Sequence, residues 1–242
     1  MPGTQQANLV TEVVERLRVL VIAGVTVGVV VAGIGSRLAM LVLRLTSPKR
    51  VLGLTSDDGF EIGRFTVSGT YNLLLLGAFV GVLGAATYMA VAPWLLGPVW
   101  LRRVTVGAAS GAVVGSMLIH ADGIDFRVLE PLWLAVVLFI ALPACFAIAM
   151  SVAVDRMRAP SSWISAGRWS WALPVILLVA FPSALLIAVP AAVFYAIWLP
   201  LRHSLADEVV VPTVLGVAIR GVWLAIAVAG LVALVNDIQA LA

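Results

Sequence analysis

The sequence has few charged residues and almost no cysteine or lysine. Only 11% of its 242 residues are charged, whereas 62% are hydrophobic. An average globular domain has about 25% charged residues, so this composition excludes an ordinary water-soluble domain and predicts an integral membrane protein. Cys145 is the single cysteine, which excludes a disulfide within the chain and a cysteine-based metal site.

The charge balance is only weakly basic, and its basic residues are dispersed. Lysine and arginine outnumber aspartate and glutamate by 15 to 12, and Lys49 is the only lysine. Nucleic-acid binding needs a basic face, so we predict no nucleic-acid partner. The principal partner expected is the lipid bilayer.

Long apolar runs predict one polytopic, all-α membrane domain over residues 1–242. Residues 1–18 have the apolar period of an amphipathic helix, expected on the cytoplasmic membrane surface. Run 171–199 is longer than the roughly 20 residues that a span needs, and we interpret it as one proline-kinked helix rather than a broken one. The six predicted spans are residues 19–36, 72–96, 104–120, 131–154, 171–199 and 212–235.

The first three spans carry small residues at every fourth position, whereas the last three contain prolines and are expected to be kinked. In membranes, small residues at this spacing let two helix backbones approach closely. We expect the three stripes to pack against one another within the chain; the alternative is a homo-oligomer or partner interface. The glycines concerned are Gly24 and Gly28, Gly77 and Gly81, and Gly107, Gly111 and Gly115.

Residues 44–71 form a polar loop that we place outside the cell. The turn formers Asp57, Asp58 and Gly59 precede β-branched and aromatic residues, which predicts a small β-hairpin.

Arginines flanking the spans suggest an orientation. Short cytoplasmic segments of membrane proteins are enriched in lysine and arginine, and this favours both termini inside a bacterial plasma membrane. The inner set is then Arg16, Arg18, Arg102, Arg103, Arg156, Arg158 and Arg168.

Several outward-facing residues have side chains suited to chemistry. Carboxylates and imidazole are suitable ligands for a divalent cation, but turn formation and helix capping explain the same residues more simply. A complete metal motif is missing, so we predict neither a metal nor a cofactor. The ligand candidates are Asp57, Asp58, Glu61, His120, Asp122 and Asp125.

Ser116, His120 and Asp122 could also be the residues of a hydrolase triad. Ser116, however, continues a small-residue stripe beside the glycines, and a Gly-x-Ser-x-Gly elbow is missing. Packing is the preferred interpretation, and no catalytic residue is predicted.

Arg220 lies inside the last apolar run. Charged residues within spans are costly and often contact a substrate or a partner subunit. The structural alternative is that Arg220 reaches the outer headgroups or pairs with Glu130 or Glu208, with Trp223 stacked against it.

Three stretches, GSRLAMLVLRLTSP, GLTSDDGFEIGRFTVSGTYN and HADGIDF, resemble those of uncharacterised multispanning membrane proteins of actinobacteria. The resemblance implies an inner-membrane location in a mycobacterium-like cell and carries no activity or catalytic residues.

The leading functional hypothesis is a non-enzymatic accessory or scaffold subunit of a cell-envelope or lipid-transport assembly. One alternative is a small-solute or lipid transporter that uses Arg220 and the kinked helices. Another is a membrane-embedded enzyme that uses His120 and the outer carboxylates.

Overall fold

The computed structural model describes residues 2–48, 66–119, 126, 128–159, 162, 169–206 and 213–241. Its regular elements within these ranges are all helical, which fits an all-α membrane protein. Five helices are long and apolar enough to cross a membrane: Leu9–Thr46, Val67–Trp94, Leu132–Arg158, Pro182–Pro200 and Arg220–Leu241. Most of the predicted β-hairpin lies outside the described residues; Val67, at its end, begins a helix capped by Thr66.

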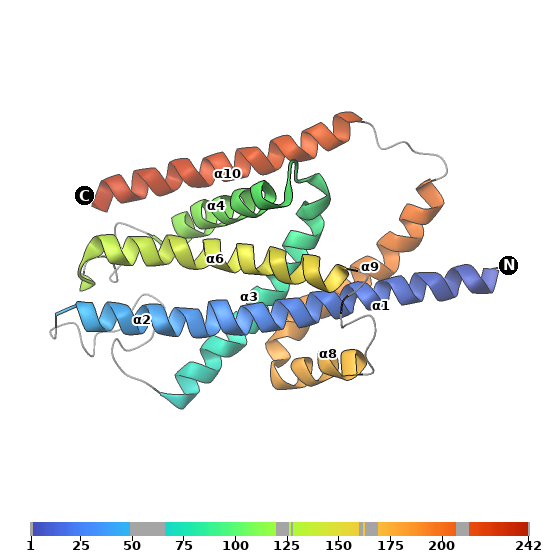
Figure 1. The fold of residues 1–242 in the computed structure, drawn as a ribbon, viewed down its shortest axis with the longest axis horizontal. Coiled ribbons are helices and arrows are strands. Elements are labelled where there is room, and N and C mark those ends of the chain that lie inside the picture. Colours follow the sequence, from blue (N-terminus) through green and yellow to red (C-terminus); the bar gives the residue numbers. More distant parts are fainter. Residues whose placement is uncertain are drawn as a thin grey trace.

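One long helix forms the axis of the molecule (Figure 1). It consists of α1 (Pro2–Val27), a π-helical segment η1 (Gly28–Ile34) and α2 (Gly35–Thr46). The amphipathic helix predicted over residues 1–18 and the span predicted over 19–36 are therefore parts of one longer helix. Its middle is mostly buried because α3, α6, α8 and α9 pack around it.

The helix α3 (Val67–Val91) crosses α1 and η1 at a contact made by glycines. A Cβ atom on Gly28 would overlap the carbonyl oxygen of Gly77, and a Cβ atom on Gly81 would overlap that of Gly24. The π-helical segment extends this contact, because it turns Gly33 toward Leu74. In a π-helix, residues five apart are hydrogen-bonded neighbours, so the contact uses Gly28 and Gly33 and departs from the four-residue spacing.

The third glycine stripe packs elsewhere. It lies on α4 (Val99–Leu118) and faces α6 (Leu132–Arg158), where Ile140 and Ile148 lie against its glycines. The expectation that the three stripes would pack against one another is therefore wrong for the third. Glycine has no side chain, so α4 can accept these large isoleucines instead of a second stripe.

The apolar run predicted as one kinked helix over 171–199 is divided. It forms α8 (Trp169–Ala180), the 3-10 turn η4 (Pro182–Ala184) and α9 (Leu185–Ala206). Phe181 leaves the helical conformation at φ −129° and ψ 73°, as residues before proline tend to do. The Ser183 hydroxyl donates to the Leu75 carbonyl of α3 at 2.6 Å, and this contact between distant segments holds the turn.

This helical hairpin reverses the direction expected for the last helix, α10 (Thr213–Leu241). Trp171 at the start of α8 lies against Arg18, and Tyr195 of α9 lies against Arg16, so the hairpin begins and ends near the same part of α1. Gly230 of α10 packs on Val113, and Leu234 packs beside Gly115. α10 therefore runs parallel to α4, whereas six alternating spans would make them antiparallel. The N- and C-termini lie at opposite ends of the molecule (Figure 1).

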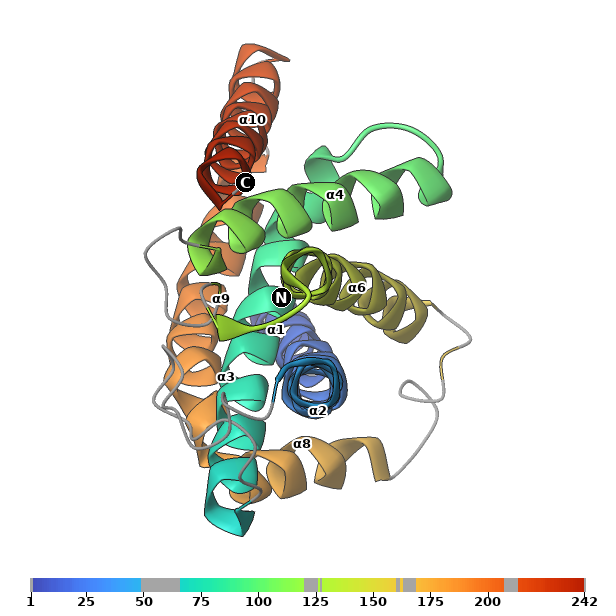
Figure 2. The same cartoon turned by 90° about the vertical axis from the view of Figure 1, so that its left-hand side faces the viewer.

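α10 is a peripheral helix. It packs mainly against α4 and stands apart from α1 and α2 (Figure 2). Most of its large apolar side chains between Val217 and Val235 are exposed.

Candidate functional site

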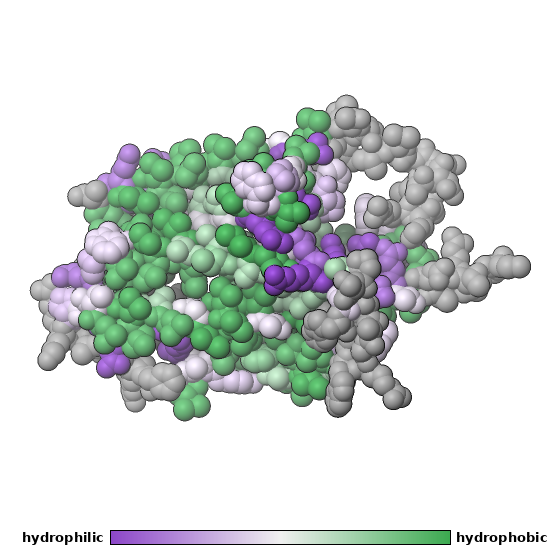
Figure 3. All heavy atoms as spheres, viewed as in Figure 1, coloured by the Kyte–Doolittle hydropathy of each residue, from purple (hydrophilic) through white to green (hydrophobic). Residues whose placement is uncertain are grey.

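Charged side chains gather where α4 begins and α6 ends. In Figure 3 a hydrophilic band crosses this part of an otherwise apolar surface. The surrounding helix ends and the middle of α1 supply an arginine cluster that we define as Arg16, Arg18, Arg102, Arg103, Arg156 and Arg158.

Asp155 joins three helices within this cluster. Its Oδ1 accepts a hydrogen bond from the Tyr88 hydroxyl of α3 at 2.9 Å. Its Oδ2 lies 3.9 Å from the Arg103 Nη2 of α4. About a third of the Arg103 side chain and slightly more of the Asp155 side chain are exposed, at 34% and 37%. Asp155 is thus a hydrogen-bonded carboxylate that only partly neutralises its surroundings.

Arg102 holds the loop between α3 and α4. Its Nη2 donates to the carbonyl of Ala92 at 3.0 Å, directly after α3, and the same carbonyl accepts from the Leu95 N–H at 3.4 Å. Pro98 precedes α4 in an extended conformation, which directs the first turn of α4, with Arg102 and Arg103, back toward α3. The Nε atoms of both arginines are buried and have no hydrogen-bond partner within the described part of the chain.

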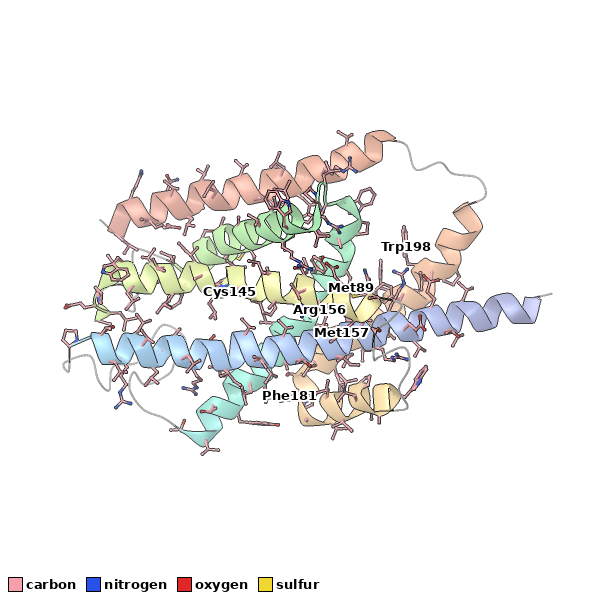
Figure 4. The ribbon with its side chains drawn as sticks, viewed as in Figure 1. Met89, Cys145, Arg156, Met157, Phe181 and Trp198 are labelled. Carbon is pink, nitrogen blue, oxygen red and sulfur yellow. The ribbon has the colours of Figure 1, made fainter. Side chains whose placement is uncertain are left out.

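The remaining arginines lie in the middle of α1 and at the end of α6. Arg16 pairs with Glu12 at 2.6 Å and lies 5.8 Å from the ring centre of Tyr195. Arg158 is within electrostatic range of Arg16. Figure 4 shows Arg156 and Met157 at the end of α6, and Met157 packs on the same buried cluster as Met89 of α3.

The cluster has an excess of positive charge. Among the described residues, its six arginines outnumber the acids Glu12, Glu15 and Asp155 on the same helices. Buried or half-buried charges cost free energy unless they are paired. Guanidinium groups form two parallel hydrogen bonds with carboxylate or phosphate, so this arrangement is suited to binding an anion.

Arg220 lies at the same end of the molecule. Its Nε donates to the carbonyl of Trp94 at 3.3 Å, and its side chain is exposed. The expected neighbour Glu130 lies at the other end, where its backbone bonds with Ser47. Because α10 runs opposite to the expected direction, the proposed pairing of Arg220 with Glu130 is wrong. Trp223 is 37% exposed on the same helix.

The other predicted site residues are mostly outside the described part of the chain. This applies to Asp57, Asp58, Glu61, His120, Asp122 and Asp125. Ser116 is described, and its hydroxyl donates to the Val113 carbonyl at 2.9 Å. Among the described residues, no three His, Cys, Asp or Glu side chains lie close enough to hold a metal ion.

The sequence interpretation did not identify Asp155, Tyr88 or the arginines as a site. It assigned the six arginines to one side of the membrane from their positions between spans, and the structure gathers them at one end. The available signal was the pair Arg102–Arg103 together with the group Asp155, Arg156 and Arg158 at neighbouring span ends. Counting charges did not show that these helix ends meet.

Comparison of the chain with protein-family models, with curated proteins and with solved structures finds no match. The class of the protein therefore rests on the fold itself, a helical architecture with several helices that could cross a membrane.

Proposed function

We propose that this chain is a non-enzymatic membrane subunit with an accessory or scaffold role in a bacterial cell-envelope or lipid-transport assembly. The observation that supports this proposal is the peripheral position of α10. Apolar side chains on its outward face include Leu224, Val228 and Leu231, which are 67%, 50% and 52% exposed. Helices associate in membranes by close packing, and a helix held along one side has a second face for a partner helix.

Co-purification in mild detergent tests the accessory role. The tagged full chain is expected to retain a stoichiometric membrane protein partner. Leu231→Trp on α10 is expected to lose that partner through a steric clash, whereas Val179→Trp is expected to keep it. Val179 is a matched control because it is 77% exposed on α8, away from α10.

If the chain purifies without a partner and, reconstituted in vesicles, transports a solute in a manner lost in Arg220→Ala, the transporter alternative replaces the accessory role.

We further propose that the N-terminus lies in the cytoplasm and the C-terminus on the outer side of the plasma membrane. This replaces our expectation that both termini are cytoplasmic. The support is the direction of the helices: α3 is antiparallel to α1, whereas α10 is parallel to α4. The hairpin α8–η4–α9 adds no net crossing, and the arginine-rich end is assigned to the cytoplasm by the positive-inside tendency.

Reporter fusions test this topology. Alkaline phosphatase, which is active only outside the cytoplasm, is expected to be active when fused after Ala242 and inactive when fused before Met1. Activity at neither terminus would overturn this proposal and favour two cytoplasmic termini.

A further inference from the structure

We infer that the arginine cluster binds the phosphate of an anionic phospholipid headgroup. This inference goes beyond the accessory role and does not rest on it, because a headgroup can bind whether or not the chain has a protein partner.

The positive charge of the cluster is only partly balanced by the described acids. Asp155 is the described acid that lies between α4 and α6, and it already accepts from Tyr88 and approaches Arg103. Its 3.9 Å separation from Arg103 is longer than a charge-assisted hydrogen bond of about 2.7–2.9 Å. Arg103 therefore retains hydrogen-bonding capacity for another anion.

The side chains of Arg102 and Arg103 are restricted in their movement. Their Nε atoms are buried, and Arg102 is tied to Ala92 by one terminal nitrogen. Two guanidinium groups held in this way have lost much of their freedom before a ligand arrives. Preorganisation of this kind favours binding because less conformational entropy is lost.

The cluster also lies at a place that suits a lipid headgroup. The cluster borders the apolar surface formed by the helices (Figure 3), where the phosphates of lipids meet their acyl chains. Trp171 and Trp198 lie at the same end, and tryptophan prefers this interface. Basic pockets between membrane helices on the cytoplasmic side bind anionic headgroups.

Native mass spectrometry of the purified full chain tests the inference. The probes are phosphatidylglycerol, cardiolipin and, as a neutral lipid, phosphatidylcholine. Wild-type protein is expected to retain the two anionic lipids preferentially. Arginine near an anionic surface contributes about 1 kcal/mol, so Arg102→Gln/Arg103→Gln is expected to weaken anionic lipid binding by roughly thirtyfold.

Matched variants separate binding from structural damage. Arg37→Gln/Arg44→Gln removes the same charge from α2, which lies away from the cluster, and is expected to leave lipid binding unchanged. Asp155→Asn keeps an oxygen for Tyr88 but removes the competing charge, so it is expected to strengthen anionic lipid binding severalfold. A purely structural role for Asp155 would not increase binding.

If Arg102→Gln/Arg103→Gln fails to fold, the exposed pair Arg156→Gln/Arg158→Gln takes its place, with binding again expected to weaken. Equal retention of phosphatidylcholine, or equal binding by the cluster variants and the control, would overturn the inference. Displacement of the lipid by inorganic phosphate at similar concentration would assign the cluster to free phosphate and overturn the headgroup assignment.

Discussion

Glycines make two different contacts in this molecule. Where α1 crosses α3, Gly24 and Gly28 meet Gly77 and Gly81 backbone against backbone. Where α4 packs on α6, the glycines mostly receive isoleucine side chains. Side chains can move by rotation, whereas two helix backbones can separate only as whole helices. The same four-residue pattern therefore predicts close approach without predicting how much an added methyl group costs.

Of the three glycine substitutions compared, Gly81→Ala is expected to lower the stability of the protein most. Its Cβ atom would overlap the Gly24 carbonyl and lie 2.6 Å from the Gly28 Cα atom. Overpacking of this kind costs about 3 kcal/mol at the upper end of its usual range, which lowers the melting temperature of a chain of this size by roughly 6–12 °C. Thermal unfolding in detergent measures the change, and an unchanged melting temperature would contradict the α1–α3 contact.

Gly111→Ala is expected to have a smaller effect. Its Cβ atom would lie 3.1 Å from the Ile140 carbonyl oxygen and 3.3 Å from the Ile140 side chain. The tight contact and the better helix propensity of alanine oppose each other, so we expect a net change within about 1 kcal/mol. The same unfolding measurement applies. A loss as large as that of Gly81→Ala would show that the two contacts are equally strict.

Gly221→Ala is expected to have the smallest effect, and of opposite sign. A Cβ atom at Gly221 meets no described atom within 4 Å. Alanine is favoured over glycine in helices by about 1 kcal/mol, so a rise in melting temperature of roughly 2–4 °C is expected. A fall instead would reveal that Gly221 is packed against something in the folded protein.

The candidate site was only partly predictable. The sequence assigned the arginines of the cluster to one side of the membrane because they lie between the apolar runs, but it did not predict that they form a site. The contact between Asp155 and Tyr88 was not predictable, since it joins residues separated by 67 positions. The placement of Arg220 was predicted at the wrong end because its helix direction depends on the hairpin before it.

The sequence by itself determined the helical membrane class and the places where helices approach closely. Apolar runs must satisfy their backbone hydrogen bonds internally in a bilayer, and glycine is the residue that permits backbone contact. These are local properties that each segment carries alone.

Only the tertiary structure decided which surfaces meet. Pro143 and Pro190 lie inside helices, whereas Pro182 begins a turn that Ser183 attaches to Leu75. A proline in the interior of a helix weakens it, and contacts with other helices decide whether the helix continues. The contact with α3 accompanies the break at Phe181, and the hairpin it holds sets the direction of α10 and the end at which Arg220 lies.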